Sequence, residues 1–312
     1  MLNDEEKNVM TKARIEVDHT GNCALCDSKN VELKKSHSIP KFVYDWLKET
    51  SKTLYIRGSD DVNSRLQDGP KEYLLCRKCE GKLSVMEREI AAKLFKKIAN
   101  YRAQQNSVVV TESMRVGILS IFWRALLTTR SRDNNRTGDD DAALDSFLLS
   151  LKNQIVSERC TTKIYFTPFV GEPPYYNLPL DYVYQLERSV GGQDVRFYDK
   201  PHRFFATFKV PFVYFYIFSD GWEGSEIYKS SELVEGNIAL NNIAVIPDEL
   251  RAYVDYMHKQ FTELKTEMSK NNLDKIKADA EKNQKITGSD ISMSRMLGVD
   301  IQSKNTSKKQ DS

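Results

Sequence analysis

The chain has 312 residues, of which 40% are hydrophobic and 10% aromatic, so it can bury the core of one large domain or of two smaller ones. Its 46 basic and 44 acidic residues leave a net charge of +2, which excludes a strongly basic overall field and makes any binding to nucleic acid local. The longest apolar stretches, 116–122 and 210–218, are shorter than the roughly 20 residues of a membrane-spanning helix. The polar, acidic start of the chain lacks the apolar run of a secretory signal, so we expect a cytoplasmic protein with reduced thiols and no membrane partner.

The first 105 residues divide into a leader and a cysteine-containing module. Residues 1–19 are polar and charged, with little to bury, and we interpret them as a loose leader. From 20 to 105 the pattern indicates short strands and loops, with one helix-like piece over 41–50 whose apolar side chains repeat at helical spacing. Ser84 and Glu87 have the spacing of a capping box, which predicts a second helix from Ser84 to about Gln104.

Residues 106–160 are predicted to form a helical region. A largely buried helix is expected over 113–129, because Met114, Ile118 and Phe122 share one side with further apolar residues. A polar loop separates it from a third helix at about 141–157. Cys160, alone at the start of a strand, is expected to be a small core residue.

Beyond residue 160 the hydrophobic period changes from that of a helix to that of a strand. Phe204, Ala206 and Phe208 alternate with more polar residues, which predicts a half-buried strand over 203–210. The stretch 212–218 is apolar on both faces, as in a central strand. Together with shorter strand-like segments before them, these predict an antiparallel sheet of four or five strands, because the connections are too short for helical crossovers.

A long helix is predicted after Pro247. Its apolar residues form a seam at alternating spacings of four and three, and they are Leu250, Val254, Met257, Phe261, Leu264 and Met268. Such a seam fits either a homodimer contact or packing within the chain. We expect 161–268 to form a recognition or regulatory domain and 269–312 a flexible polar tail, so the predicted fold class is α+β throughout.

Two CxxC pairs, Cys23 with Cys26 and Cys76 with Cys79, account for four of the five cysteines. Four thiolates can close a tetrahedral zinc site, and a structural zinc ion holds loops together where no apolar core can. Four unrelated buried thiols would rarely produce two such pairs in reduced surroundings. The spacing therefore predicts a structural zinc site, with residues 27–75 between its two halves.

The segment between the pairs, VELKKSHSIPKF, leads a strand into His37, followed by Ile39 and Pro40. With the four cysteines, residues 21–98 resemble an HNH, or ββα-metal, endonuclease module of the four-cysteine variety. This resemblance implies hydrolysis of phosphodiester bonds in nucleic acid, with DNA the expected substrate. The strings SHSIPK, QDG and LLCRKCE also resemble a group of uncharacterised bacterial HNH-like proteins, some of which lie near anti-phage genes, which implies a role in antiviral defence.

The resemblance also implies roles for particular residues. His37 takes the place of the general base, and Glu80, directly after the last cysteine, takes the place of a ligand to a catalytic Mg²⁺ or Mn²⁺. Ser36 stands where the family usually has Asp or His. A second ligand would then come from Asp68, from the acidic residues at 60–61 or from the substrate, and Arg65 and Asp68 would contact phosphate and metal.

Alternatives to these roles remain open. The stretch 67–70 is equally well read as a simple turn, and His37 as a structural residue of a zinc-stapled loop. Glu87 is better explained as the carboxylate of the capping box than as a catalytic group. The remaining histidines, His19, His202 and His258, are expected to be solvated or locally bonded. The competing function is a non-catalytic adaptor that binds nucleic acid or a protein partner.

Overall fold

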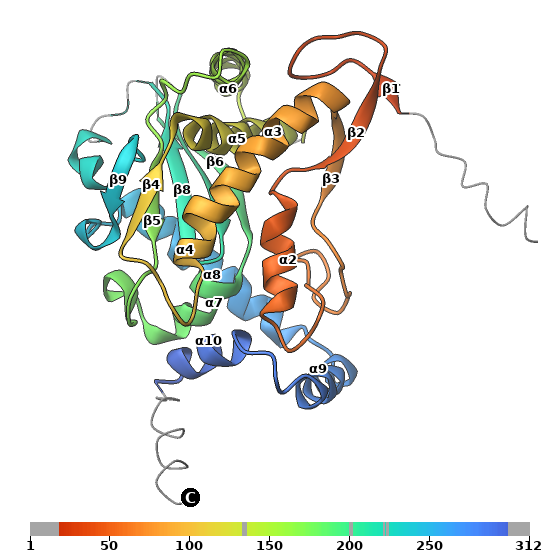
Figure 1. Cartoon of the computed structure of the whole chain (residues 1–312), viewed down its shortest axis with the longest axis vertical. Coiled ribbons are helices and arrows are strands. Elements are labelled where there is room, and N and C mark those ends of the chain that lie inside the picture. The colour runs from red at the N-terminus through yellow and green to blue at the C-terminus, as the bar shows by residue number, and fades with distance from the viewer. Residues whose placement is uncertain (1–18, 133–135, 200–201, 221, 223–224, 299–312) are drawn as a thin grey trace, which may run out of the picture.

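The computed structural model describes residues 19–132, 136–199, 202–220, 222 and 225–298. Its N-terminal part is a three-stranded antiparallel sheet in the order β1-β2-β3, in which Ser36 of β2 lies opposite Glu72 of β3. The helix α2 follows β2, and the helix α3 follows β3 directly (Figure 1). The bounds of these elements are Thr20–Gly21 (β1), Val31–His37 (β2), Lys41–Glu49 (α2), Lys71–Cys76 (β3) and Arg77–Ile90 (α3).

The helix α3 begins at Arg77, so the prediction that it starts at a capping box on Ser84 is wrong. The second cysteine pair is itself the start of the helix, because Cys76 is its extended N-cap residue and Cys79 lies in its first turn. Glu87 therefore caps nothing and instead accepts a hydrogen bond from Arg124. A π-helical turn, η1 (Ala91–Phe95), and the short α4 (Lys96–Ile98) complete this helix.

The predicted helical region follows β4 (Ser107–Val110) and consists of α5 (Glu112–Ser131) and α6 (Gly138–Val156). Thr111 caps α5, because its hydroxyl accepts a hydrogen bond from the Met114 amide. Most of the residues between Met114 and Leu126 are buried, which confirms the expected central position of this helix. Its contacts with α3 and α6 join the N-terminal module to the rest of the chain.

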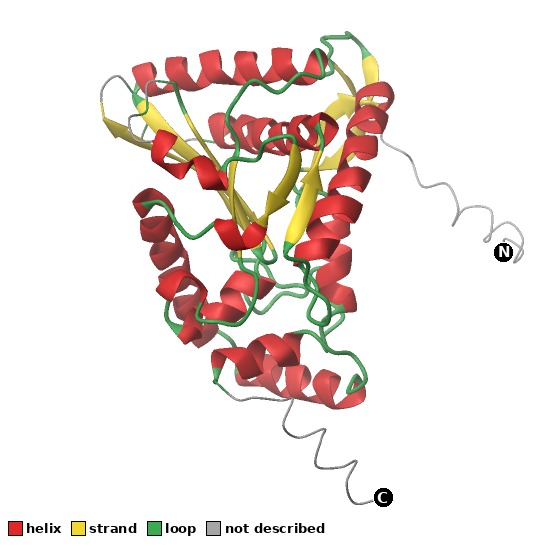
Figure 2. Cartoon of the chain, turned by 60° about the vertical axis from the view of Figure 1, so that its left-hand side comes forward, coloured by secondary structure: helices red, strands yellow, loops and turns green. Residues whose placement is uncertain are grey.

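A four-stranded antiparallel sheet in the order β5-β8-β7-β6 confirms the predicted sheet. The strands are β5 (Tyr165–Pro168), β6 (Gly191–Asp199), β7 (Arg203–Val210) and β8 (Val213–Phe218). The strand β7 is buried on both faces, whereas its alternating pattern predicts burial on one. Phe204 and Phe208 pack on α6 and α5, and Tyr214 of β8 packs on the opposite side against Tyr253 of α8 (Asp248–Thr266). Figure 2 shows the strands lying between these helices.

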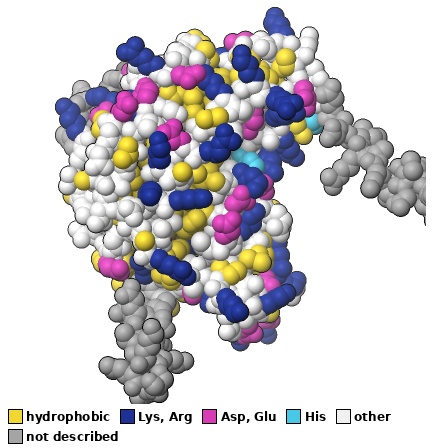
Figure 3. Space-filling view, viewed as in Figure 1, with side chains coloured by type: hydrophobic (Ala, Val, Ile, Leu, Met, Phe, Trp, Pro, Cys, Tyr) yellow, Lys and Arg dark blue, Asp and Glu magenta, His cyan; other side chains and the backbone are white. Residues whose placement is uncertain are grey.

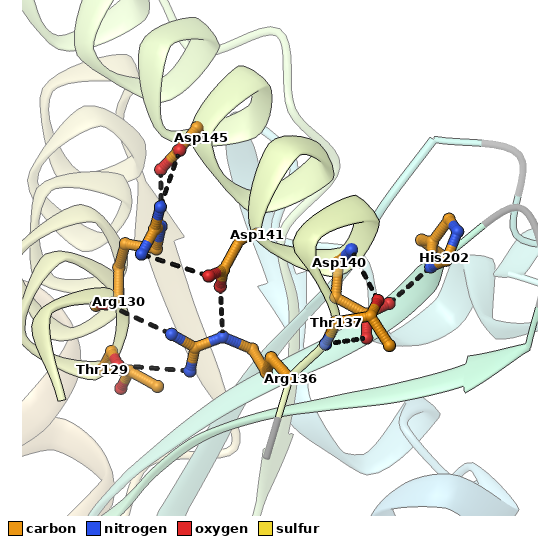
Figure 4. Close-up of polar contacts among 8 residues, drawn as sticks. All are labelled: Thr129, Arg130, Arg136, Thr137, Asp140, Asp141, Asp145 and His202. Carbon is orange, nitrogen blue, oxygen red and sulfur yellow. Dashed lines mark hydrogen bonds and ion pairs between the residues drawn. The ribbon is translucent and has the colours of Figure 1, made fainter. Parts of the chain in front are cut away.

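The start of α6 carries a network of polar contacts that ties it to the sheet (Figure 4). Thr137 and Asp140 form a capping box, in which each side chain accepts a hydrogen bond from the amide of the other. His202, after β6, contacts the same carboxylate, with Nδ1 2.6 Å from Asp140 Oδ1. Arg136 pairs with Asp141, the next residue of the same turn, at 2.7 Å. His202 is thus bonded to a carboxylate 62 residues away in the sequence, and not within its own turn.

Short elements complete the fold around the sheet. The strand β9 (Gly236–Ala239) pairs with β4 in a two-stranded antiparallel sheet, and α7 (Val183–Arg188) precedes β6. The 3-10 helices are η2 (Tyr175–Asn177), η3 (Leu180–Tyr182), η4 (Ser225–Ser231) and η5 (Leu240–Asn242). Buried residues of the cysteine module, α5 and the sheet form one continuous hydrophobic core.

The first half of the predicted seam on α8 is part of this core. Leu250 and Val254 are fully buried, and Met257 packs against the core from its edge. Phe261, further along, is only half-buried and lies beside the Tyr184 ring, 6.2 Å between centroids. Internal packing thus accounts for the N-terminal part of the seam.

The stretch expected to be a flexible tail contains two further helices, α9 (Lys270–Lys282) and α10 (Ser289–Met296). Polar composition gives no sign that α10 docks, because it does so through a buried polar residue. Ser292 is fully buried and donates a hydrogen bond to Glu187 Oε2 over 2.6 Å. Residues 299–312 of the predicted tail, and 1–18 of the predicted leader, lie outside the described residues.

Candidate metal centre and adjoining histidine site

The four cysteines of the two CxxC pairs come together, as predicted. Their sulfur atoms all lie within 4.8 Å of one another, and Cys26 Sγ is 3.8 Å from Cys76 Sγ. A tetrahedral zinc ion with Zn–S bonds of about 2.3 Å separates its sulfur ligands by about 3.8 Å. Within the described residues, this is the one group of three or more His, Cys, Asp or Glu ligands arranged to hold a metal ion. The cluster can therefore bind a metal such as zinc.

Backbone hydrogen bonds position the two halves of this cluster. The Asp27 amide donates to Cys23 O and closes the first turn, and the Ala24 amide donates to Leu74 O of β3 over 2.9 Å. The Cys76 amide lies 3.3 Å from Cys23 Sγ, so the second half donates toward a sulfur of the first. These hydrogen bonds hold the loop of the first cysteine pair against the start of α3 without a metal ion.

The thiols of the cluster differ in their surroundings. Cys26 is exposed, and hydrogen bonds from the side chain and backbone of Ser28 lower its pKa to about 6. Cys79 is buried, and burial raises its pKa. A metal ion binds cysteine as the thiolate. Binding would therefore change the protonation state most at Cys79, where burial disfavours the charged form. Cys160 is outside the cluster, and burial raises its pKa to about 11, which agrees with the expected core position.

His37 is the last residue of β2 and faces the loop that precedes β3. Its Nε2 lies 2.8 Å from Asp68 Oδ1, and 13% of its side chain is exposed. The ring also lies beside Tyr44 of α2, 5.9 Å between centroids. Arg124 of α5 donates to the carbonyl oxygen of His37 over 2.9 Å, which fixes the backbone at the end of the strand. Neighbouring side chains thus hold both the ring and the backbone of this histidine.

Asp68 belongs to this histidine pair. Burial by itself would raise its pKa, but hydrogen bonds from Lys71, His37 and the Gly69 amide outweigh burial and lower the pKa to about 2. Lys71 Nζ is 2.7 Å from the second carboxylate oxygen. Gly69 is required here, because a Cβ atom would overlap the Tyr44 ring. Residues 67 and 68 form a bend, whose geometry places the Asp68 carboxylate on His37.

Glu80 lies on the other side of β2, in the first turn of α3. Ser36 Oγ donates a hydrogen bond of 2.5 Å to Glu80 Oε2, and Ser36 is 2% exposed. The two positions that the resemblance assigns to metal ligands therefore lie against each other. Adjacent residues of a strand point to opposite faces, so Ser36 and His37 face different neighbours.

Two further residues near this site were not expected from the sequence, because neither belongs to a local motif. Glu72 is paired in register with Ser36 across β2 and β3, and its carboxylate accepts a hydrogen bond from Thr128 of α5. Arg124 is 2% exposed and joins His37 O to the Glu87 carboxylate, which lies 2.6 Å from Nη2. Glu72 could have been found from the sequence, because side chains alternate along paired strands and the residue opposite Ser36 lies on the same face. Nothing in the local sequence indicates that Arg124, on α5, reaches the end of β2.

Arg65 and the acidic pair before it lie away from His37. The Arg65 guanidinium stacks over the Tyr55 ring at 4.4 Å and pairs with Asp279 of α9 at 3.5 Å. Asp61 accepts hydrogen bonds from the amide of Asn63 and the hydroxyl of Ser64, within its own turn. These contacts give Arg65 and Asp61 structural partners other than Glu80 and His37.

The face of the β2–β3 hairpin that carries His37 is basic and aromatic. Lys35 pairs in register with Tyr73, and His37 with Lys71. The Lys35 ammonium lies 5.9 Å from the centre of the Tyr73 ring, which His19 stacks upon at 3.6 Å. Figure 3 shows Lys and Arg side chains interspersed with carboxylates over this side of the molecule. His258 lies elsewhere, stacked on Tyr182.

No family model matches this chain, and neither the curated proteins nor the solved structures that were searched contain a match. The class of protein is therefore defined by the fold and the cysteine cluster alone. The described part of the chain is a mixed α+β protein with an N-terminal four-cysteine cluster that can bind a metal. None of its described helices is long and apolar enough to cross a membrane.

Proposed function

We propose that this chain is a zinc-stapled, metal-dependent endonuclease of the HNH type, which hydrolyses phosphodiester bonds in nucleic acid. One observation carries the proposal: Ser36 and His37 end β2, and Glu80 meets Ser36 from the first turn of α3. The strands β2 and β3 are separated along the chain by α2 and the loop 50–70, but they pair with each other, and α3 follows β3 directly beside the four-cysteine cluster. This arrangement supports the resemblance because it brings Glu80 to Ser36, next to His37 in the sequence.

In this proposal the zinc ion is structural and His37 is the general base. Histidine can accept a proton near neutral pH, so it can deprotonate an attacking water. Asp68 would act as its positioning residue, because a carboxylate on one ring nitrogen fixes the ring and leaves the other nitrogen to accept the proton. Arg124 would position the same histidine through its backbone.

A second, catalytic divalent cation would be held by Glu80 and Ser36. Both offer oxygen, which Mg²⁺ and Mn²⁺ prefer, and Mg²⁺ is commonly held by one or two carboxylates and the substrate phosphates. Glu72 is the nearest further carboxylate by register, because it lies directly across from Ser36. When bound, such an ion would neutralise the phosphate charge and stabilise the leaving oxygen.

The expected substrate is DNA. Lys35, Lys71 and Tyr73 lie on the same face of the hairpin as His37. Lysine contributes phosphate contacts, and an aromatic ring offers a surface on which a base can stack. The biological setting that the resemblance implies, bacterial antiviral defence, belongs to the same proposal.

The test is a cleavage assay with purified full-length protein. Plasmid, linear DNA and RNA are incubated with Mg²⁺, Mn²⁺ or EDTA, and the variants His37→Ala and Glu80→Ala are compared with the wild type. Each variant should lose at least about 100-fold in metal-dependent cleavage, with zinc content unchanged, because neither residue is a cysteine ligand. Undiminished cleavage by His37→Ala would remove it as the base.

The second candidate function is a non-catalytic adaptor that binds nucleic acid or a protein through the same module. Ser36 favours it, because a neutral hydroxyl replaces the metal-binding side chain usual at that position. An adaptor would bind DNA with a strong salt dependence and leave it intact in every metal tested. Binding without cleavage therefore separates the two functions.

A further inference from the structure

The loop between α2 and β3, residues 50–70, has little regular structure of its own. An isolated β-bridge within the loop joins Ile56 to Leu66 through two backbone hydrogen bonds of 2.9 Å. The last part of the loop presents Asp68 to His37. Two backbone hydrogen bonds within a loop of this length give it little stability. Its position therefore depends on the residues of other elements that pack against it.

The segment 267–296, here called the C-terminal arm, contacts this loop around Asn63. The Ser269 amide donates to Asn63 Oδ1 over 2.8 Å, and Asn272 Nδ2 donates to the same oxygen over 3.1 Å. In return, Asn63 Nδ2 donates to Glu267 O over 3.1 Å. Asn63 therefore has its amide oxygen and its amide nitrogen engaged by the arm.

Two neighbouring contacts extend this attachment along α9. Arg57 Nη2 donates to Asn272 Oδ1 over 3.3 Å, and Arg65 pairs with Asp279 at 3.5 Å. Both arginines also lie over the Tyr55 ring. The middle of the loop is thus fastened to the arm through polar groups.

A second attachment fastens the start of the loop. The Ser289 amide donates to Thr50 O, and Asn283 Nδ2 donates to Lys52 O, each over 2.9 Å. Gly288, with φ of 147°, makes this approach possible, because a Cβ atom would come within 2.5 Å of Thr50 O. The arm therefore turns sharply just where it reaches the end of α2.

The two helices of the arm differ in how firmly they are held. The helix α10 is anchored by the fully buried Glu187, which accepts hydrogen bonds from Ser292 and Arg295. The helix α9 has no buried residue, and Leu273 on it is 51% exposed. A 13-residue helix is marginal on its own, and segments with few buried apolar contacts open at low cost in free energy. Within the arm, α9 is therefore the helix with fewer buried contacts to hold it in place.

We propose that α9 is a detachable strap that holds the loop 50–70 closed and so keeps Asp68 on His37. Release of α9 would free the loop around Asn63 and let Asp68 withdraw from the histidine. The strap is a property of the fold alone. That it regulates cleavage rests on the proposed function, because only then is His37 the base.

Hydrogen–deuterium exchange of the full chain tests the strap. The double variant Asn272→Ala with Asp279→Ala removes its side-chain contacts to Asn63, Arg57 and Arg65. The matched control, Asn271→Ala with Asp274→Ala, makes the same changes at exposed positions of the same helix, so both gain equally in helix propensity. The amides of Ile56 and Leu66 should exchange about tenfold faster in the double variant only, since each lost hydrogen bond contributes modestly.

Two results would overturn the strap. One is unchanged exchange in the loop of the double variant, and the other is an equal increase in β2 and β3, which would mean general destabilisation. The measurement needs no activity, so a chain that cuts no nucleic acid can still confirm the strap. A chain that cuts while its loop exchange stays unchanged would reject the strap and leave the proposed function standing.

Discussion

Ser36 of β2 and Glu80 of α3 are joined by a hydrogen bond of 2.5 Å, with the serine hydroxyl as donor. The contact forms because the second cysteine pair passes directly into α3, so that the helix presents its first turn to β2. Ser36 is buried and Glu80 is partly exposed, and a hydrogen bond to a charged acceptor is stronger than one between neutral groups. This pair is the clearest place at which to test for a second metal ion.

Replacing Ser36 by aspartate should create a stronger cation site. Ser36→Asp places a second carboxylate against Glu80, so without metal the two like charges should lower the melting temperature. Mn²⁺ should raise it again, with about tenfold tighter binding than in the wild type, because Mn²⁺ prefers oxygen anions. Scanning fluorimetry with a Mn²⁺ titration measures both effects. Ser36→Ala, which adds no ligand, is the control, and an equal Mn²⁺ response in both variants would argue against the site.

Removal of the second cysteine pair should cost both metal and fold. In the variant with Cys76→Ser and Cys79→Ser, we expect one zinc per chain to be lost, and residues 20–80 to lose their structure, because a structural zinc contributes directly to folding. Elemental analysis and circular dichroism measure the two effects. Cys160→Ala, which changes a buried cysteine outside the cluster, should keep its zinc. A folded wild-type protein that contains no zinc would contradict the metal assignment.

Gly69→Ala should displace the turn that carries Asp68. The added Cβ atom would overlap the Tyr44 ring, and such overpacking typically costs about 1–3 kcal/mol in the free energy of unfolding. Gly81→Ala is the matched control: no atom lies within 4 Å of its added Cβ, and alanine within α3 should stabilise by up to about 1 kcal/mol. Chemical denaturation compares the two. Equal stability of the variants would mean that Tyr44 moves aside freely.

Stability in acid should report the charge on Asp68. Its folded-state pKa of about 2 lies below the ordinary value of 3.8, so its contribution to stability is complete above about pH 4. That contribution is lost as the pH falls through about 2, because the protonated carboxyl no longer attracts Lys71. Asp68→Asn should therefore flatten the loss of stability between about pH 4 and pH 2, measured by denaturation at each pH. The exposed Asp274→Asn is the control, and an unchanged slope in Asp68→Asn would contradict the pairing.

The two halves of the seam on α8 should respond differently to charge. Val254→Glu puts a carboxylate into the core and should cost more than about 4 kcal/mol in unfolding free energy. Phe261→Glu, at a half-buried position, should leave a folded protein. Light scattering across a wide concentration range shows whether the remaining half-buried residues pair two chains. A constant mass near 36 kDa in the wild type would exclude the dimer.

Much of the fold follows from patterns that are local in the sequence. The CxxC pairs, the buried helix around Phe122 and the strands flanking Phe212 all depend on spacing within about ten residues, where periodicity is informative. The start of α3 was mispredicted because two local signals competed, and the cysteine pair prevailed over the capping box at Ser84. Two-sided burial of β7 also escaped prediction, because α8, on the far side of the sheet, comes much later in the chain.

By itself, the sequence determined that four cysteines form a cluster that can bind a metal and that the fold is α+β, because both follow from short-range spacing and hydrophobic period. Only the tertiary structure decided which groups surround Ser36 and His37. Glu72 arrives through strand register and Arg124 through the packing of α5, while the arm reaches the loop before β3 through polar contacts to Asn63. Such contacts join residues tens to hundreds of positions apart, and their side chains carry no local signal of the partner that folding brings to them.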